Sequence, residues 1–301
     1  MYIVTGATGN TGNVVARKLL ADGQRVRVIG RSAEHLRPLA AEGAELFVCD
    51  LADAGALTGA FAGARAMYAM VPPDITGDDY RAHQDRIADA MATAIEETGL
   101  THVVALSSIG ADKTEKTGPI VGLHYLEQRL NRIAGLNVLH LRAGYFMENT
   151  LAQIGIIQAT GMAAGPLRSE LKLPMIATRD IGATAAEALL RLDFSRQQTS
   201  ELLGERDMSM AEAAAVIGRA IGRPDLAYVQ LPDEQVRGAL TQLGMSPNAA
   251  GLILELSAAL NSGHVAALEE RSPRNTTPTS YETFVAEEFV PRYQSQPTRA
   301  E

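Results

Sequence analysis

The 301-residue chain has one cysteine, no tryptophan and an aromatic fraction of only 5%. Its single cysteine, Cys49, cannot form an internal disulfide, and its place in the apolar run "AELFVCD" favours a small buried side chain. The six histidines are scattered, and no Cys/His cluster has the spacing of metal ligands, so we predict no bound metal. No apolar run approaches the length that crosses a membrane, which argues against a membrane partner.

Positive charge is also in short supply. Lys and Arg number 27 against 35 Asp and Glu, for a formal net charge of −8. A nucleic-acid surface normally needs clustered Lys and Arg, so we expect no nucleic-acid partner. The first apolar strand begins at Tyr2 and leaves no room for a leader with charged and apolar regions, which makes the cytoplasm the expected location.

The first half of the chain alternates short apolar runs with helical patterns, as in a parallel sheet covered on both faces. The predicted strands are Tyr2–Thr5, Arg25–Gly30, Glu45–Cys49, Ala66–Met70, His102–Ser107 and Val138–Arg142. The predicted helices are Thr11–Ala21, Ala33–Ala41, Ala54–Phe61, Tyr80–Thr98 and Gly122–Ile133. This rhythm predicts an α/β, Rossmann-like, doubly wound parallel sheet that binds its ligand at the carboxyl ends of the strands.

Past the sixth strand the pattern becomes less regular and richer in helices. We expect residues 1–150 to form a dinucleotide-binding domain, with a later segment at about 171–206 returning to it. Residues 151–170 and 207–290 are then a smaller, mainly helical C-terminal substrate lobe. Residues 291–301 have little apolar content and are predicted to be a flexible tail.

The opening "YIVTGATGNTG" places Gly6, Gly9 and Gly12 three residues apart between a strand and a helix. Glycine is used where φ is positive or where backbones approach closely, and a helix N-terminus attracts phosphate. We expect this turn to hold a pyrophosphate, with further donors from the side chains of Thr8, Asn10 and Thr11. The spacing differs from the standard Gly-x-Gly-x-x-Gly fingerprint, so a glycine-rich turn without a ligand is the alternative.

The second strand ends in "VRVIGRS", where an NAD-specific protein usually carries an acid for the ribose 2′-hydroxyl. Arg31 can instead pair with a 2′-phosphate, which favours NADPH/NADP as cofactor, with Ser32 beside it. A solvated arginine ahead of a helix is the alternative interpretation. Further cofactor contacts are expected at the ends of the third and fourth strands, from Asp50, Leu51, Met70 and Val71.

Several short segments together resemble one known family. The segments "TGATGNTG", "GRS", "CDLAD", "ALSSIGA", "GLHYLEQRL", "LRAGYFMENT" and "RDIGATAAEAL" are similar to those of the NmrA-like, atypical short-chain dehydrogenase/reductase family, with a pattern close to the bacterial NAD(P)H:quinone oxidoreductases of type 2. The resemblance implies a strand order of 3-2-1-4-5-6-7 and NADPH across the carboxyl edge of the sheet. Members of this family are either reductases of quinones and other electron-poor molecules or non-catalytic NADP(H)-binding regulators.

The helix that carries the catalytic pair in the standard dehydrogenases departs from their pattern here. It has Tyr125 followed by Arg129, where a lysine is usual, and arginine differs from lysine in shape and acidity. The resemblance points to the neighbouring His124 as the polar group that faces the nicotinamide, ahead of Tyr125. Adjacent helical residues point about 100° apart, so both cannot face the site equally. Either side chain could instead serve packing.

Two other groups are expected near the nicotinamide. Ser107 and Ser108 follow the fifth strand, where serine commonly contacts the cofactor or the substrate, or else caps a turn. Tyr145 and Phe146 follow the sixth strand and are expected to form a wall over the ring. An aromatic wall suits a flat, apolar acceptor.

These features predict an NADPH-dependent reductase that transfers a hydride to a small conjugated carbonyl or quinone-like acceptor of apolar or aromatic character. The alternatives are a non-catalytic NADP(H)-binding redox sensor and an imine or enone reductase. An apolar helical stripe is typical of core or dimer packing and leaves a homodimer open. The stripe comprises Met245, Leu252, Leu256 and Leu260.

Overall fold

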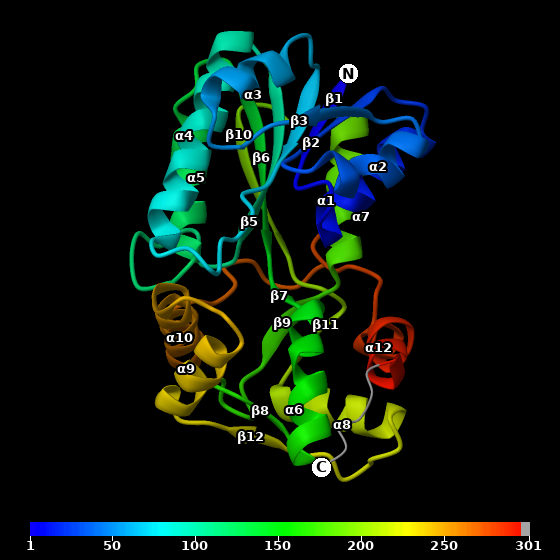
Figure 1. Ribbon diagram of the computed structural model, residues 1–301, viewed down its shortest axis with the longest axis vertical. Helices are drawn as coiled ribbons and strands as arrows, with labels where there is room; N and C mark the ends of the chain where they lie inside the picture. Colours follow the sequence, from blue (N-terminus) through cyan, green and yellow to red (C-terminus); the bar gives the residue numbers. More distant parts are fainter. Residues whose placement is uncertain (296–301) are drawn as a thin grey trace.

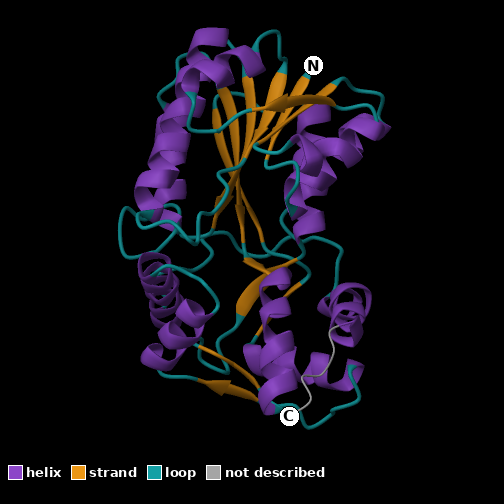
Figure 2. Cartoon of the chain, in the orientation of Figure 1, coloured by secondary structure: helices purple, strands orange, loops and turns teal. Residues whose placement is uncertain are grey.

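The computed structural model describes residues 1–295, which form two lobes stacked along the long axis of the molecule (Figure 1). The upper lobe contains a large sheet between two layers of helices, and the lower lobe combines helices with short strands (Figure 2). No helix among the described residues is both long and apolar enough to cross a membrane.

The upper lobe is built on a seven-stranded parallel sheet in the order β10-β6-β5-β4-β1-β2-β3. The strands are β1 (Tyr2–Thr5), β2 (Val26–Gly30), β3 (Glu45–Val48), β4 (Ala66–Ala69), β5 (His102–Ser108), β6 (Asn137–Ala143) and β10 (Gln197–Leu202). β1 and β4 are buried along their whole length, as expected for strands covered on both faces. With β10 as the seventh strand, the predicted order 3-2-1-4-5-6-7 is confirmed.

Six helices cover this sheet, three on each face (Figure 1). One layer contains α1 (Asn10–Ala21), α2 (Ala33–Ala41) and α7 (Thr178–Arg191), and the other contains α3 (Ala54–Phe61), α4 (Tyr80–Thr98) and α5 (Ile120–Asn131). Side chains of β1 alternate between the two layers, since Val4 belongs to the core under α1 and Ile3 to the core under α4. The predicted doubly wound architecture is therefore confirmed.

The helix boundaries follow from local capping. The side chains of Ser32, Asp53 and Asp79 accept hydrogen bonds from backbone N–H groups in the first turns of α2, α3 and α4, which satisfies donors that a helix start leaves free. These three helices have the predicted bounds. α5 starts two residues earlier than predicted, because Pro119 precedes it with a φ of −60° that already suits a helix.

The lower lobe has its own core and two small sheets. Three strands pair in the order β11-β9-β7, and β8 pairs with β12. Its elements are β7 (Tyr145–Phe146), η1 (Met147–Ala152), α6 (Gln153–Thr160), β8 (Ala163–Gly165), β9 (Leu173–Ile176), β11 (Arg206–Met208), α8 (Met210–Ala220), β12 (Tyr228–Gln230), α9 (Asp233–Gln242), α10 (Pro247–Ser262), α11 (Tyr281–Phe284), η2 (Val285–Phe289) and α12 (Val290–Ser295). The lobe therefore contains more β-strands than the predicted, mainly helical lobe would have.

The chain passes between the lobes at points that differ from the predicted boundaries. β7 already belongs to the lower lobe, so the first domain segment ends near residue 143 rather than 150. The returning segment begins at α7 and not at residue 171, because β9 pairs with β7 and β11 in the lower lobe. Such short strands carry no sequence signal for the sheet that they join, since both sheets accept the same apolar residues.

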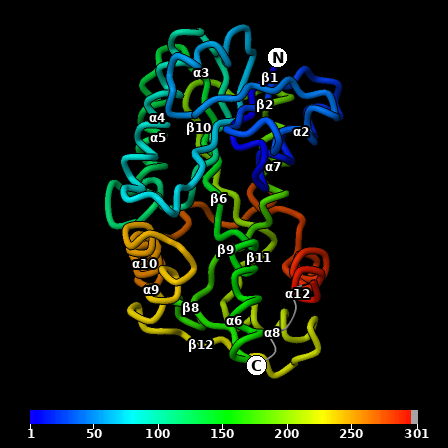
Figure 3. The backbone as a smooth tube through the Cα atoms, in the orientation of Figure 1, coloured from blue at the N-terminus to red at the C-terminus, as the bar shows by residue number. Residues whose placement is uncertain are grey.

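The predicted tail is wrong at its start. Residues 290–295 form α12, which continues the helical run from Tyr281 (Figure 3); residues 296–301 lie outside the described part. Tyr281, Phe284, Val285 and Phe289 are buried in the lower-lobe core. Their spacing is the helical signal that the composition of the last residues obscured.

Candidate functional site

The glycine-rich turn between β1 and α1 is shaped by close contacts. Gly6 has a φ of +62°, and a Cβ on it would stand 2.0 Å from the Cε of Met70. A Cβ on Gly12 would stand 2.3 Å from the carbonyl oxygen of Gly6, so α1 can approach β1 only without a side chain there. Gly9 lies just before α1 with extended backbone, and no side chain of residues 1–295 caps the helix. The first-turn N–H groups therefore face outward for a ligand.

A cavity of about 260 Å³ opens beside this turn. Thr8, Gly9, Asn10, Asn13 and Val14 form one wall, and residues of the lower lobe, α7 and the C-terminal helices form the other. Thr8 and Asn10 are exposed. The turn thus offers backbone donors and short polar side chains to one open cavity, which fits a diphosphate.

Thr11 does not take part as predicted. Its side chain is buried, and its hydroxyl accepts a hydrogen bond of 2.9 Å from the hydroxyl of Tyr68 on β4. Thr11 therefore fixes α1 to the sheet rather than facing a phosphate. The backbone carbonyl of Tyr68 also accepts a hydrogen bond from the hydroxyl of Thr5. Tyr68 lies 63 residues from Thr5 and 57 from Thr11 in sequence, so only the order of strands in the sheet brings the three residues together.

The ends of β2 and β3 carry the residues expected around the adenosine. Within residues 1–295, Arg31 is exposed and forms no ion pair, so its guanidinium is free for an anion. The hydroxyl of Ser32 caps α2 at the backbone N–H of His35, at 3.4 Å. Asp50 is exposed and accepts from the N–H of Ala52 at 2.9 Å. Leu51 is only 6% exposed and packs in the core.

The end of β4 lies against the glycine-rich turn. The hydroxyl of Thr5 accepts from the N–H of Met70 at 2.8 Å, and the side chain of Met70 covers Gly6. Met70 is half-buried, whereas Val71 is 8% exposed and packs into the α4 layer. The two residues thus lie at the carboxyl edge of the sheet, Met70 beside the glycine-rich turn and Val71 behind it.

Ser107 is part of a buried charged network rather than an open site. Its hydroxyl donates to a carboxylate oxygen of Glu127 at 2.6 Å, and Arg142 donates to both oxygens of the same carboxylate at 2.9 and 2.7 Å. Glu127 is 2% exposed. The hydrogen bonds to Glu127 raise the pKa of the Arg142 guanidinium. This network ties α5 to β5 and β6 and occupies the hydroxyl that was expected at the nicotinamide.

His124 and Tyr125 point to different neighbours, as their adjacency on α5 requires. Nδ1 of His124 lies 2.8 Å from the carbonyl oxygen of Ala111, in the loop that follows β5. A carbonyl only accepts, so Nδ1 carries a proton and Nε2 is left for another partner. Ser108 ends β5 at the start of the same loop and is half-buried. His124 and Ser108 thus border one loop at the carboxyl edge of the sheet.

Tyr125 is not brought to this edge. Its hydroxyl donates to Asp89 of α4 at 2.9 Å, and Arg129 donates to the same carboxylate oxygen at 2.7 Å. The hydrogen bond to Asp89 raises the pKa of the Tyr125 hydroxyl. The side chains at both positions of the standard catalytic pair therefore serve the contact between α4 and α5, and the Tyr125 hydroxyl is held by Asp89.

Tyr145 and Phe146 form β7, at the passage from the upper to the lower lobe. Both are half-buried; Phe146 packs against the upper core and Tyr145 against the lower core. Burial raises the pKa of the Tyr145 hydroxyl to about 12, despite its hydrogen bond to Asn149. Tyr145 is therefore suited to forming a wall and poorly suited to losing a proton.

Sequence reasoning missed four charged residues that line the cavity beside the glycine-rich turn: Glu148, Arg179, Glu288 and Arg292. Glu148 follows β7 and accepts from the N–H and the hydroxyl of Thr178, at 2.9 and 2.5 Å, where α7 begins. Burial raises the pKa of its carboxyl. Glu148 and Arg179 lie in the family-like segments "LRAGYFMENT" and "RDIGATAAEAL", but neither segment predicts this cavity, because its charged residues come from three segments that only the interlobe packing brings together.

The described residues contain no group of three or more His, Cys, Asp or Glu side chains that could hold a metal ion. The charged groups at the site are instead the exposed Arg31 after β2 and a mixed set of arginines and glutamates around the cavity. This chemistry suits an organic anion such as a dinucleotide.

Comparison with known proteins supports this interpretation. A model of the NmrA-like family matches residues 2–289. The chain is 30% identical over 280 residues to the NAD(P)H azoreductase of Xenophilus azovorans, an alignment that covers 92% of this chain and 93% of the relative. The family resemblance found in the sequence is thereby confirmed.

Two solved structures share the fold. The NADPH-dependent quinone oxidoreductase QOR2 of Escherichia coli, complexed with NADPH, is 20% identical with a TM-score of 0.74, and covers 97% of this chain and 100% of its own. The triphenylmethane reductase of Citrobacter sp., complexed with NADP(H), is 18% identical with a TM-score of 0.78, and covers 96% and 100%. At these identities the likeness concerns the fold alone.

The buried network generates a stability prediction. Glu127→Gln leaves the largely buried Arg142 without its bidentate counter-ion, so the free energy of unfolding should fall by about 3 kcal/mol, the range for breaking a buried pair. Urea denaturation followed by circular dichroism measures this loss. Asp89→Asn is the control: it breaks the pair with Arg129, in which Asp89 is 50% exposed, and should cost about 1 kcal/mol or less. Equal losses would contradict the structural role given to Glu127.

Proposed function

The chain belongs to the NmrA-like family, and we propose that it is an NADPH-dependent reductase that transfers a hydride to a small conjugated carbonyl or quinone-like acceptor. The observation that carries the proposal is the uncapped start of α1 beside a cavity, with the exposed Arg31 at the neighbouring strand end, unpaired within residues 1–295. The first feature fits the diphosphate of a dinucleotide. The second fits a 2′-phosphate and distinguishes NADPH from NADH.

The cofactor would be held along the carboxyl edge of the sheet. Backbone N–H groups after Gly9, with Thr8 and Asn10, would bind the diphosphate, Arg31 the 2′-phosphate, and Met70 would border the path toward the nicotinamide. The glycines at 6 and 12 serve this arrangement by letting β1, α1 and Met70 approach closely. Thr11, Ser107 and Leu51 support the site from within the core and are not proposed as cofactor contacts.

The chemistry of hydride donation would be supplied by NADPH when it is bound. The residues of this chain would position the acceptor and exclude water. Tyr145 and Phe146 offer an aromatic surface for a flat acceptor. Because Nδ1 of His124 is held by the Ala111 carbonyl, a second proton on the ring resides on Nε2, from which it can pass to an oxyanion on the reduced acceptor.

A non-catalytic NADP(H)-binding regulator is the second candidate, and one observation favours it. Tyr125 and Arg129, at the positions of the standard catalytic pair, are both bound to Asp89. A quinone needs a general acid less than a simple ketone does, so the missing pair is compatible with the reductase. Reduction of an imine or enone is a third possibility. It would use the same cofactor and differ from quinone reduction only in the shape of the acceptor site.

The decisive test is NADPH consumption, followed at its absorbance band, with quinones, azo dyes, triphenylmethane dyes, enones, imines and aldehydes. We expect turnover with quinones or other conjugated, electron-poor acceptors and none with simple aldehydes. Tight NADPH binding without turnover on the whole panel would favour the regulator instead. Turnover confined to imines or enones would support the third possibility.

Arg31 should decide the cofactor preference. Arg31→Asp replaces a phosphate partner by a repelling charge, so the Kd for NADPH should rise by about 30-fold while that for NADH changes little. Isothermal titration of the two nucleotides measures both constants. Arg37→Asp makes the same charge change at another exposed position nearby, on α2, and should leave the NADPH/NADH ratio near its original value. An equal effect of Arg31→Asp on both nucleotides would remove Arg31 from the 2′-phosphate site.

His124 should matter for turnover and not for cofactor binding. His124→Ala removes the free Nε2 and should lower kcat by about 100-fold, in the range of general acid catalysis, with the Kd for NADPH nearly unchanged. Tyr125→Phe is the matched control on the adjacent residue, and it should keep kcat because its hydroxyl faces Asp89. An unchanged rate in His124→Ala would assign the histidine to holding the Ala111 loop.

A further inference from the structure

The C-terminal helical segment, residues 281–295, forms part of the wall of the cavity at the glycine-rich turn. Phe284, Glu288 and Arg292 line the cavity from this segment. In a regular α-helix, each step of four residues rotates the side chain by about 40° around the helix axis, so residues spaced by four gradually leave one side of the helix. The π-helical turn of η2 (Val285–Phe289) widens the helix locally and keeps the three side chains on one side, and such turns often occur at functional sites.

We infer that this segment completes the cofactor site and that Arg292 is an additional ligand of the cofactor's diphosphate. The inference rests on the proposed function, because it concerns how the same nucleotide is held. The family model matches residues 2–289, so Arg292 lies beyond the matched part.

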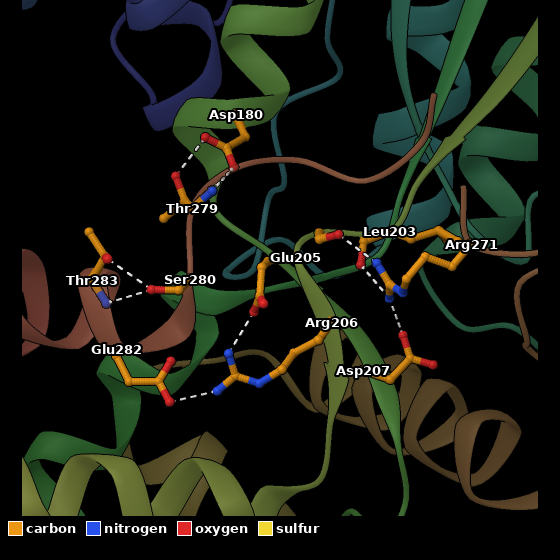
Figure 4. Close-up of polar contacts among 11 residues, drawn as sticks. Asp180, Leu203, Glu205, Arg206, Asp207, Arg271, Thr279, Ser280, Glu282 and Thr283 are labelled. Carbon is orange, nitrogen blue, oxygen red and sulfur yellow. Dashed lines mark hydrogen bonds and ion pairs between the residues drawn. The ribbon is translucent and has the colours of Figure 1, made fainter. Parts of the chain in front are cut away.

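Hydrogen bonds hold the start of this segment in place, as Figure 4 shows. Asp180, in the first turn of α7, accepts from the N–H of Thr279 at 2.9 Å and from its hydroxyl at 2.7 Å. Ser280 then caps α11 by accepting from the N–H of Thr283 at 3.1 Å. Because α7 packs along α1, these bonds fix the segment relative to the glycine-rich turn.

Two arginines fix the same region to β11 (Figure 4). Arg206 pairs with Glu282 at 2.6 Å and with the neighbouring Glu205 at 2.6 Å. Arg271 donates to the carbonyl oxygens of Leu203 and Gly204, at 3.0 and 2.5 Å, and pairs with Asp207. The interlobe segment that precedes residue 281 is therefore held at Arg271 and at Thr279, and these contacts place the helical segment that follows it.

The charged side chains around the cavity differ in how far contacts within the protein already occupy them. The carboxylate of Glu148 is occupied at the start of α7 by Thr178. Arg179 donates to Thr279 at 3.0 Å and to Glu287 at 2.5 Å. Among the described residues, Arg292 pairs only with Glu288, at 2.8 Å, and the two side chains are 49% and 41% exposed. Such exposed pairs are weak, so Arg292 is the guanidinium that a bound anion can recruit.

A diphosphate is the anion that this geometry favours. Across the cavity from Arg292 lie Gly9 and Asn10, where the uncapped first turn of α1 presents its N–H groups. Backbone donors on one side and a guanidinium on the other would enclose the two phosphates. Arg31 lies at a different strand end, so the contribution of Arg292 should not depend on the 2′-phosphate.

The test compares nucleotide affinities, measured by isothermal titration, in single variants of the full chain. Arg292→Gln should raise the Kd for NADPH and for NADH by the same factor of about five, the effect of one partly exposed charge-assisted contact. Arg292→Lys should keep most of the affinity. Glu288→Gln releases Arg292 and removes a negative charge from the wall, so it should lower both constants about twofold.

Two controls show whether the effect belongs to Arg292 and to the diphosphate. Arg17→Gln removes an exposed arginine of α1 that pairs with Glu42 at 2.8 Å, and it should leave both constants unchanged. Adenosine 2′-monophosphate has no diphosphate and should bind equally to the original chain and to Arg292→Gln. Unchanged constants in Arg292→Gln, a loss limited to NADPH, or a loss in Glu288→Gln as large as in Arg292→Gln would overturn the inference. If the original chain bound neither nucleotide, the proposed function itself would fail.

Discussion

The close approach of α1 to the end of β1 is the constraint on which the site depends. Gly12 lies against the carbonyl of Gly6, and Gly6 turns with positive φ beneath Met70. A side chain at either position would push α1 away from the sheet. The start of α1 would then lose its place at the carboxyl edge, where its free N–H groups face the cavity.

A second constraint acts on α5. Its inner face is tied to the sheet by the buried pair of Glu127 and Arg142, and its outer face is tied to α4 by Tyr125, Arg129 and Asp89. The helix is held from both sides, which sets the position of His124 at the Ala111 loop. The residues that a standard dehydrogenase uses for chemistry thus serve here to place the helix.

The lower lobe contributes to the site through segments that return to the upper lobe. The segment after β7 places Glu148 at the cavity, the start of α7 places Arg179 there, and the C-terminal helices place Glu288 and Arg292. The bonds of Asp180 to Thr279 connect two of these segments directly. The proposed cofactor site is consequently a property of the interlobe packing as well as of the Rossmann sheet.

The sheet, its helices and the glycine-rich turn were predictable from the amino-acid order, because their signals are local. Apolar periodicity, capping residues and glycine spacing act within one or two turns of chain. For the same reason Arg31 could be placed at the end of β2. The roles of Thr11, Ser107 and Tyr125 were not predictable, since each depends on a partner that is distant in sequence: Tyr68, Glu127 and Asp89.

Only the tertiary structure decided which polar side chains face the cavity and which are buried in pairs. A hydroxyl or carboxylate at a strand end has the same local pattern in both cases, and its direction is set by the nearest buried partner that would otherwise remain unsatisfied. The C-terminal helix illustrates the same limit. Its polar final residues resembled a free tail, whereas the fixed segment before it places Arg292 at the glycine-rich turn.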